Sequence, residues 1–197
     1  METKLKIIDE LDKSCKGIHL RGLSRAVKTG LPNVRRFLVN LEDENVVKVE
    51  KSANLSIFKL KESEKTMAYL KQVHTERFLD LPGRIRLAIS DFLKDIEISP
   101  LIALIFGSYA SGNYTEESDI DLLLVFQKVD GRAEFERVAG RIGMRTNTKL
   151  SPIYISYPNF KKNFLDKNHD FSKEIRQNAI IINGIENYYS LLWRFLE

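Results

Sequence analysis

The stretch LIALIFGSYASGNYTEESDIDLLLVF, residues 101–126, contains two apolar runs separated by a polar segment. The first run, residues 101–106, lies between Pro100 and Gly107 and has the length and composition of a buried strand. Gly107 and Ser108 follow it as a turn that opens a helix, where backbone N–H groups can face an anion. The stretch therefore predicts a strand that ends at a phosphate-binding turn.

Two carboxylates stand at the head of the second apolar run. Because side chains alternate along a strand, Asp119 and Asp121 are expected on one face. Two ionised carboxylates repel each other, and a divalent cation such as Mg²⁺ between them removes that repulsion. A phosphate-binding turn beside such a pair indicates metal-assisted phosphoryl or nucleotidyl transfer. The structural alternatives are a Gly-Ser pair that is only a turn and an Asp-x-Asp that is only a solvated strand end.

The Gly107-Ser108 pair, Gly112, Ser118 and the Asp119-x-Asp121 motif together resemble the signature of the polymerase-β-type nucleotidyltransferases. The likeness is to the small, minimal members of this superfamily found in archaea and bacteria. It implies a nucleoside triphosphate as substrate or ligand and a Mg²⁺ or Mn²⁺ ion. On this resemblance, the catalytic and metal-binding residues are Asp119 and Asp121, and the nucleotide-binding residues are Gly107, Ser108 and Ser118.

The same family normally takes a third carboxylate from a later strand. Residues 149–157, KLSPIYISY, predict that strand, and Ser151 aligns with the acid. Serine cannot act as an anionic ligand, and an incoming hydroxyl loses the usual assistant for its deprotonation. Nucleotide binding is therefore better supported by the sequence than catalysis.

The composition is that of an ordinary globular chain of 197 residues, 43% hydrophobic and 29% charged. No apolar stretch approaches the roughly 20 residues that a membrane-spanning helix needs, and the N-terminus has no apolar signal core. We therefore expect a cytoplasmic protein without a membrane partner. The single cysteine, Cys15, cannot form an internal disulfide and is expected to pack near a helix end.

The net charge of +4 is concentrated in the first third of the chain. Residues 1–65 hold fourteen Lys and Arg against ten Asp and Glu, whereas residues 66–197 hold seventeen of each. A basic N-terminal part suggests a polyanionic partner such as DNA. A solvated surface without a partner would also give a bias of this size.

Residues 1–65 predict a small domain of their own. Apolar residues recur at helical spacing over residues 3–15, with Thr3 as the cap, over residues 20–27, and over residues 31–41, which begin at Leu31-Pro32. A turn at Gly30 joins the last two helices. Residues 45–50 and 55–60 flank a polar tip and predict a β-hairpin. This order resembles the winged helix-turn-helix DNA-binding domains of prokaryotic transcription regulators.

If the third helix lies in the major groove, its exposed face contacts bases, with the preceding turn and the wing on phosphates. The candidate DNA-binding residues are Lys28, Asn33, Arg35, Arg36, Asn40 and Lys51, with Asn54 also on the wing. The alternatives are a solvated face of an amphipathic helix, or a winged domain that serves only for protein docking or dimerisation.

The remaining chain predicts connecting helices over residues 66–97 and a nucleotidyltransferase-like domain over residues 98–197. The order strand, strand, helix, strand indicates a mixed sheet with flanking helices, so the fold class expected is α/β (α+β). Residues 171–183 are expected to form one apolar-faced helix that Asn183-Gly184 ends. Four basic residues could reach a triphosphate or could lie on a solvated helix face: Lys161, Lys162, Lys173 and Arg176.

Two functions from different classes follow. The first is a nucleotidyltransferase that transfers a nucleoside monophosphate to a small molecule, an RNA or a protein, with an N-terminal domain that binds DNA. The second is a transcription regulator whose nucleotidyltransferase domain is a non-catalytic nucleotide sensor or an antitoxin-like partner of another protein. We also expect a homodimer, because winged domains usually contact two half-sites, and the apolar positions of residues 66–79 could contribute to its contact.

Overall fold

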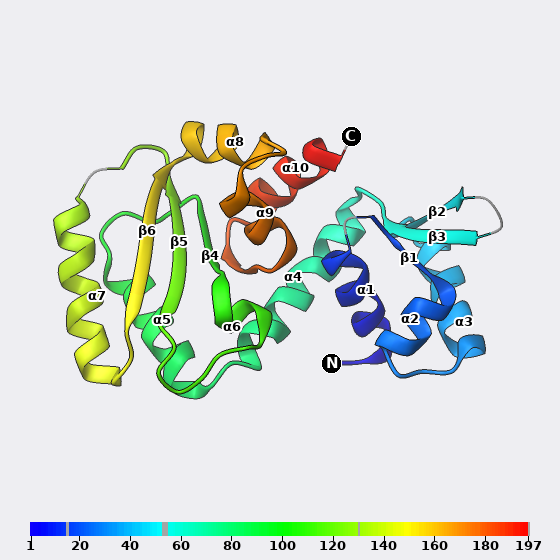
Figure 1. The fold of residues 1–197 in the computed structure, drawn as a ribbon, viewed down its shortest axis with the longest axis horizontal. Coiled ribbons are helices and arrows are strands. Elements are labelled where there is room, and N and C mark those ends of the chain that lie inside the picture. The colour runs from blue at the N-terminus through cyan, green and yellow to red at the C-terminus, as the bar shows by residue number, and fades with distance from the viewer. Residues whose placement is uncertain (15, 53–54, 130, 197) are drawn as a thin grey trace. The chain divides into compact units, whose positions relative to one another are not determined.

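The computed structural model describes residues 1–14, 16–52, 55–129 and 131–196. The chain divides into two compact units, Met1–Glu76 and Arg77–Glu197, and the elements of both are labelled in Figure 1. The division falls inside α4 (Glu64–Leu79), so the boundary at residue 65 stays a prediction. Cys15 and Asn54, for which the sequence predicted a packing role and a place on the wing, lie outside the described residues.

The first unit contains helices and a small antiparallel sheet. Its elements before α4 are α1 (Thr3–Lys13), β1 (Ile18–His19), α2 (Leu20–Ala26), α3 (Leu31–Asp43), β2 (Val47–Ser52) and β3 (Leu55–Leu60). The three predicted helices and the hairpin are present, and every end lies within two residues of expectation. Thr3 is not the cap of α1, because the N-cap position belongs to Glu2 and Thr3 is the first helical residue.

The sequence missed β1, which makes the sheet three-stranded. The strand order is β1-β3-β2, and Ile18 and His19 pair with Phe58 and Ile57 of β3. A strand of two residues is too short to show alternation, so its pairing with β3 alone defines it. The observed order in the first unit is therefore helix, strand, helix, helix, strand, strand.

Apolar stripes of the helices form the core of this unit. Leu38 and Leu41 of α3 are buried, as the helical spacing predicted, and α3 packs against α2 and β2. Leu70 and Val73 of α4 are also fully buried within the chain. These two positions of residues 66–79 are therefore covered and do not form an exposed dimer surface.

The second unit is built on a four-stranded mixed sheet, of which β4, β5 and β6 are labelled in Figure 1. Its strands are β4 (Ile102–Ile105), β5 (Ile120–Phe126), β6 (Leu150–Ser156) and β7 (Ile180–Asn183), and its helices are α5 (Gly83–Asp95), α6 (Gly107–Ser111), α7 (Arg132–Thr146), α8 (Tyr157–Leu165), α9 (Asp170–Gln177) and α10 (Ile185–Leu196). The strand order is β6-β5-β4-β7. Strand β5 runs parallel to β6 and antiparallel to β4, and β4 runs antiparallel to β7. The mixed α+β fold class is thereby confirmed.

Alternation along β5 assigns its side chains to two faces. Ile120, Leu122, Leu124 and Phe126 join the apolar core formed with α5 and α7. The intervening residues must point to the opposite face, where α8 contacts β5 and α10 contacts β4. Asp121 belongs to this second set, so the face that carries it is the one opposite α5 and α7.

The predicted helix over residues 171–183 was wrong in its second half. Helix α9 ends at Gln177, and Ile180–Asn183 is β7 at the edge of the sheet. Three consecutive β-branched residues favour a strand over a helix. Gly184 is needed for close approach rather than as a helix cap, because a Cβ there would lie 1.8 Å from the Leu101 carbonyl oxygen.

Among the described residues, none of the helices combines the length and the apolar character that crossing a bilayer requires.

Candidate functional site

The two carboxylates lie at the start of β5. Asp119 immediately precedes the strand and Asp121 is its second residue, with the fully buried Ile120 between them on the other face. The Ile120 amide donates to the carbonyl oxygen of Lys149 at 2.7 Å, which joins this end of β5 to the start of β6. Both carboxylates therefore share one face of the sheet, as the strand alternation predicted.

Gly107 allows the Asp121 carboxylate to lie against the turn after β4. Its φ of +68° lies in the left-handed region, and a Cβ at this position would be 2.3 Å from Asp121 Oδ2. Real side chains do not approach so closely, so only glycine fits beside the carboxylate in this arrangement. The sequence predicted Gly107 as a nucleotide ligand. The structure adds a steric reason for glycine at this position, which is the close approach of the Asp121 carboxylate.

Lys149 and Ser151 both bond to Asp119. Lys149 Nζ donates to Asp119 Oδ2 at 2.5 Å, and Ser151 Oγ donates to the same oxygen at 3.2 Å. Ser151 pairs in register with Asp121 across the parallel β5–β6 ladder, so it lies on the carboxylate face, and its correspondence to a third acid stays a prediction. The sequence missed Lys149, although it stands two residues before Ser151 and thus on the same side of the strand.

The two carboxyl groups are perturbed in opposite directions. The hydrogen bond from Lys149 holds the pKa of Asp119 below its usual value, with a smaller contribution from Ser151. Burial raises the pKa of Asp121, and the negative charges of Asp119 and Glu174 raise it further. Asp119 is therefore neutralised by a partner, whereas the charge of Asp121 is opposed by its surroundings.

Asp119 and Asp121 are the acids that the described residues bring together at the start of β5. No group of three or more His, Cys, Asp or Glu side chains suited to a metal ion occurs among the described residues. Glu174 of α9 is near enough to act on the charge of Asp121, yet it is not part of such a group. The sequence gave no signal for Glu174, because its position depends on how α9 packs.

The two serines predicted to bind nucleotide lie in different surroundings from each other. Ser108 lies in the first turn of α6, beside Gly107. Ser118 lies in the loop before β5, where its hydroxyl accepts from the Thr115 amide at 2.9 Å. The Ser118 hydroxyl thus closes a local turn, and nucleotide binding by either serine stays a prediction.

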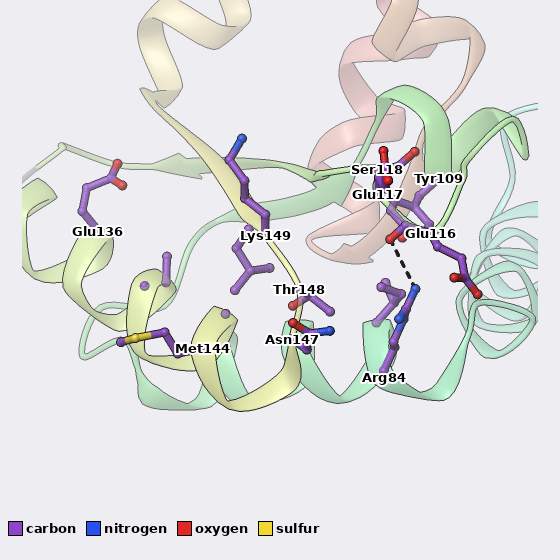
Figure 2. A pocket seen from close by; sticks show the side chains of 15 residues that line it. Arg84, Tyr109, Glu116, Glu117, Ser118, Glu136, Met144, Asn147, Thr148 and Lys149 are labelled. Carbon is purple, nitrogen blue, oxygen red and sulfur yellow. Dashed lines mark hydrogen bonds between the residues drawn. The ribbon is translucent and has the colours of Figure 1, made fainter.

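A cavity of about 600 Å³ is lined by residues of α5 and α7 and by the segments just before β5 and β6. Figure 2 shows its lining, which includes Arg84, Glu136 and Lys149. Arg84 donates to the Glu116 carbonyl oxygen at 3.4 Å at one side of it. Core residues of α5 and α7 also line it. Ser118 and Lys149 line it as well, so the cavity borders Asp119, although Asp121 is not among its described lining residues.

Arg176 does not reach a triphosphate. Its side chain is 6% exposed and donates to the carbonyl oxygens of Phe164 and Asp166, while its guanidinium lies 3.9 Å from the centre of the Phe195 ring. Arg176 therefore holds the C-terminal helices together. Lys173 forms an ion pair with Asp170 on α9.

The six candidate DNA-binding residues of the first unit are all exposed: Lys28, Asn33, Arg35, Arg36, Asn40 and Lys51. Four of them lie on α3, Lys28 precedes it, and Lys51 lies on β2. Their side chains form no ion pair with other described residues, apart from a contact of the Arg36 guanidinium with the Phe37 ring. They remain a prediction, since exposure alone does not identify a ligand.

The family match to known proteins falls within the second unit, Arg77–Glu197. The model of the nucleotidyltransferase domain family matches residues 86–183, which include all four strands and both carboxylates. A protein of Methanocaldococcus jannaschii with the provisional name protein adenylyltransferase is 31% identical over 96 residues, which are 44% of this chain and 94% of the relative. Since the match takes in nearly the whole of that relative, this chain belongs to the nucleotidyltransferase domain family of the polymerase-β superfamily.

Proposed function

We propose that the chain transfers a nucleoside monophosphate from a nucleoside triphosphate to an acceptor, with Mg²⁺ or Mn²⁺ held by Asp119 and Asp121. The observation that carries this proposal is the carboxylate pair on one face of β5, with Gly107 leaving room beside Asp121. Burial raises the pKa of Asp121, and the negative charges of Asp119 and Glu174 raise it further, so a cation beside this carboxylate would relieve that opposition. Oxygen ligands with uncompensated negative charge fit a divalent cation.

The transfer balances as a displacement at the α-phosphorus. The oxygen of an acceptor hydroxyl forms a bond to this phosphorus and loses its proton to water, while the bond to the bridging oxygen breaks and pyrophosphate leaves with that oxygen. When bound, a divalent cation supplies charge stabilisation to the phosphate oxygens. Gly107 and Ser108 are proposed to bind the terminal phosphates, and Ser118 to support the loop beside them.

The acceptor and the nucleotide are proposed by analogy with the relative. Its provisional name specifies an adenylyl group and a protein acceptor, so ATP and a protein are the first choices here. A small molecule or an RNA are the other acceptor classes to be tested. Incubation with each labelled nucleoside triphosphate and Mg²⁺ or Mn²⁺, followed by detection of pyrophosphate and of labelled protein, gives the answer. Release that Asp121→Ala abolishes supports the enzyme, whereas no release with any nucleotide argues against it.

Ser151 makes a sharper test, because we propose that it corresponds to the third acid of the family and it lies opposite Asp121 on β6. Ser151→Asp would put a carboxylate where Ser151 Oγ now lies, 3.2 Å from Asp119 Oδ2. Without metal, the added repulsion is on the order of 1 kcal/mol for charges near solvent, and the protein should melt a few degrees lower. With Mg²⁺ this loss should disappear, and transfer should rise by on the order of 10²-fold because a base and metal ligand are restored. A variant that melts lower even with Mg²⁺ and shows no transfer would refute the enzymatic proposal.

Ser151 also motivates a second candidate, a regulator whose nucleotidyltransferase unit binds nucleotide without turnover. In this proposal the first unit is a winged helix-turn-helix domain that binds DNA as a dimer. Its support is the element order of the first unit and six exposed polar residues without ion pairs. Fluorescence anisotropy with duplex DNA at several salt concentrations tests the DNA binding, because the salt dependence of the affinity increases with the number of phosphates contacted. Sedimentation of a monomer alone at micromolar concentration would contradict the dimer.

A further inference from the structure

A second cavity lies within the first unit, between two of its helices and its sheet. Its volume is about 670 Å³, which falls in the range of ligand pockets. Three arginines line it: Arg21 and Arg25 of α2 and Arg35 of α3. None of the candidate functions above accounts for Arg21 or Arg25.

The charge around this cavity has one sign. Among the described residues no carboxylate lines it, and none of the three guanidinium groups has a hydrogen bond or ion pair. Arg21 and Arg25 are four residues apart on α2, so they project from the same side of that helix. Neighbouring guanidinium groups repel each other unless an anion lies between them, and a phosphate accepts two donors from one guanidinium. The cavity is therefore suited to a phosphate group.

Two further groups add neutral hydrogen-bond capacity. The backbone amide of Gly22 donates to His19 Nδ1 at 2.7 Å. Because Nδ1 is the acceptor, a neutral His19 carries its proton on Nε2, where it is a donor. His19 and Ser56 both line the cavity, so donors outnumber obligate acceptors around it.

The remaining wall is apolar. Leu20, Leu55 and Phe58 line the cavity beside the arginines, and Leu55 is 56% exposed. An exposed leucine and an aromatic ring beside three cations fit a ligand with a flat apolar part joined to an anionic part. Inorganic phosphate would leave the apolar wall without a contact, whereas the base of a nucleotide can pack on it.

We propose that this cavity binds a mononucleotide, with its phosphate between Arg21, Arg25 and Arg35 and its base against Phe58 and Leu55. The site lies wholly in the first unit and differs from the carboxylate site of β5. It shares Arg35 with the candidate DNA-binding face of α3, but Asn33, Arg36 and Asn40 of that face are not among its described lining residues. The inference does not depend on nucleotidyl transfer.

The test is calorimetric titration of the full chain with AMP, GMP, CMP and UMP in EDTA, so that no divalent cation loads the carboxylate site. At least one mononucleotide should bind, and its nucleoside without phosphate should bind at least about tenfold more weakly, because charge-assisted hydrogen bonds are lost. Arg21→Gln/Arg25→Gln should weaken binding by at least about tenfold. Both arginines are exposed, so the melting temperature should stay near that of the parent chain.

Matched variants separate this site from the alternatives. Arg36→Gln changes an exposed arginine of α3 outside the cavity and should leave mononucleotide binding unchanged. Asp119→Ala/Asp121→Ala removes the carboxylate pair and should also leave it unchanged. The proposal is overturned if no mononucleotide binds, if phosphate-free nucleosides bind equally well, or if the Arg21→Gln/Arg25→Gln protein keeps full affinity. It is also overturned if duplex DNA alone binds and Arg36→Gln weakens that binding as much as the Arg21 and Arg25 changes do.

Discussion

Gly107 and Gly112 form a matched pair of glycines that separates backbone strain from interference with Asp121. Both have a left-handed backbone, with φ of +68° and +79°. A Cβ on Gly112 meets nothing within 4 Å, whereas a Cβ on Gly107 lies 2.3 Å from Asp121 Oδ2. Alanine at either position therefore carries the same backbone cost, and only the change at Gly107 disturbs the carboxylate.

The expected magnitudes follow from these two contacts. A left-handed alanine costs roughly 1–2 kcal/mol, which lowers the melting temperature of a chain of this size by roughly 2–8 °C. The clash at Gly107 involves the end of a side chain that can rotate, so Gly107→Ala should be destabilised little more than Gly112→Ala. The Asp121 carboxylate must, however, move by about 0.7 Å to reach the 3.0 Å at which Cβ contacts begin to occur. A displacement of this order can reduce a catalysed rate by about 10²-fold.

The assay compares both alanine variants with the parent chain for melting temperature, for Mg²⁺-dependent nucleotide binding and for nucleotidyl transfer. We expect similar losses of melting temperature, near-normal transfer by Gly112→Ala and a loss of about 10²-fold by Gly107→Ala. If Gly107→Ala binds nucleotide and transfers it as well as Gly112→Ala does, the Asp121 carboxylate is not held in place for function, and the reasoning fails.

Three further predictions concern single substitutions. Gly140→Ala in the middle of α7 should stabilise the protein by about 0.5–1 kcal/mol, because its Cβ meets nothing within 4 Å. Gly143→Ala should destabilise it, because a backbone carbonyl oxygen lies 2.7 Å from that Cβ. Urea unfolding that ranks the two variants in the opposite order would contradict this. Lys149→Met removes an exposed ion pair, so it should reduce stability at neutral pH by only about 0.2–1 kcal/mol. It should also raise the pKa of Asp119. An Asp119 pKa that NMR titration finds unchanged would count against the Lys149–Asp119 contact. The lowered pKa of Asp119 gives stability above the unfolded-state pKa that is lost as pH falls through the folded-state pKa, and the Lys149→Met protein should lose less on acidification. The raised pKa of Asp121 gives stability below the unfolded-state pKa that is lost as pH rises through the folded-state pKa. Asp121→Asn in EDTA should therefore gain stability relative to the parent chain as pH rises to neutrality. Parallel pH profiles of the two proteins would exclude the proposed burial of charge.

The sequence predicted the centre of the second unit because its signals there are local. The apolar runs of β4 and β5, the Gly-Ser turn and the alternation that puts Asp119 and Asp121 on one face all lie within 26 residues of sequence. Ser151 was placed beside Asp121 by the position of a later strand, and the parallel register confirms that neighbourhood. Within one strand, the alternation of side chains is sufficient to predict which residues share a face of the sheet.

Elements defined by pairing or packing were missed. Strand β1 exists only through its two pairs with β3, and β7 depends on a place at the edge of the sheet beside β4. The buried position of Arg176 arises from carbonyl oxygens and a ring that α8 and α10 bring together. No spacing in one dimension predicts such contacts, because the residues involved are 10 to 19 positions apart or lie on different elements.

The charges at the carboxylate site have a consequence for how a metal would bind. Asp119 already has Lys149 and Ser151 as partners, so a cation there must displace or share an ammonium group. Within the described part of the chain the Asp121 carboxylate has no hydrogen-bond or ion-pair partner, but two acids with one lysine present little net negative charge. Mg²⁺ retains its water ligands strongly and is usually bound with substrate phosphates rather than by protein alone. We therefore expect the ion to bind together with a nucleoside triphosphate, whose phosphates supply the anionic ligands that Ser151 cannot. Mg²⁺ titrated without nucleotide should give little or no heat, and the same titration in the presence of a bound nucleotide should give saturable binding that Asp121→Ala removes. Tight binding of Mg²⁺ in the absence of nucleotide would show that a further acid, such as Glu174, completes the site.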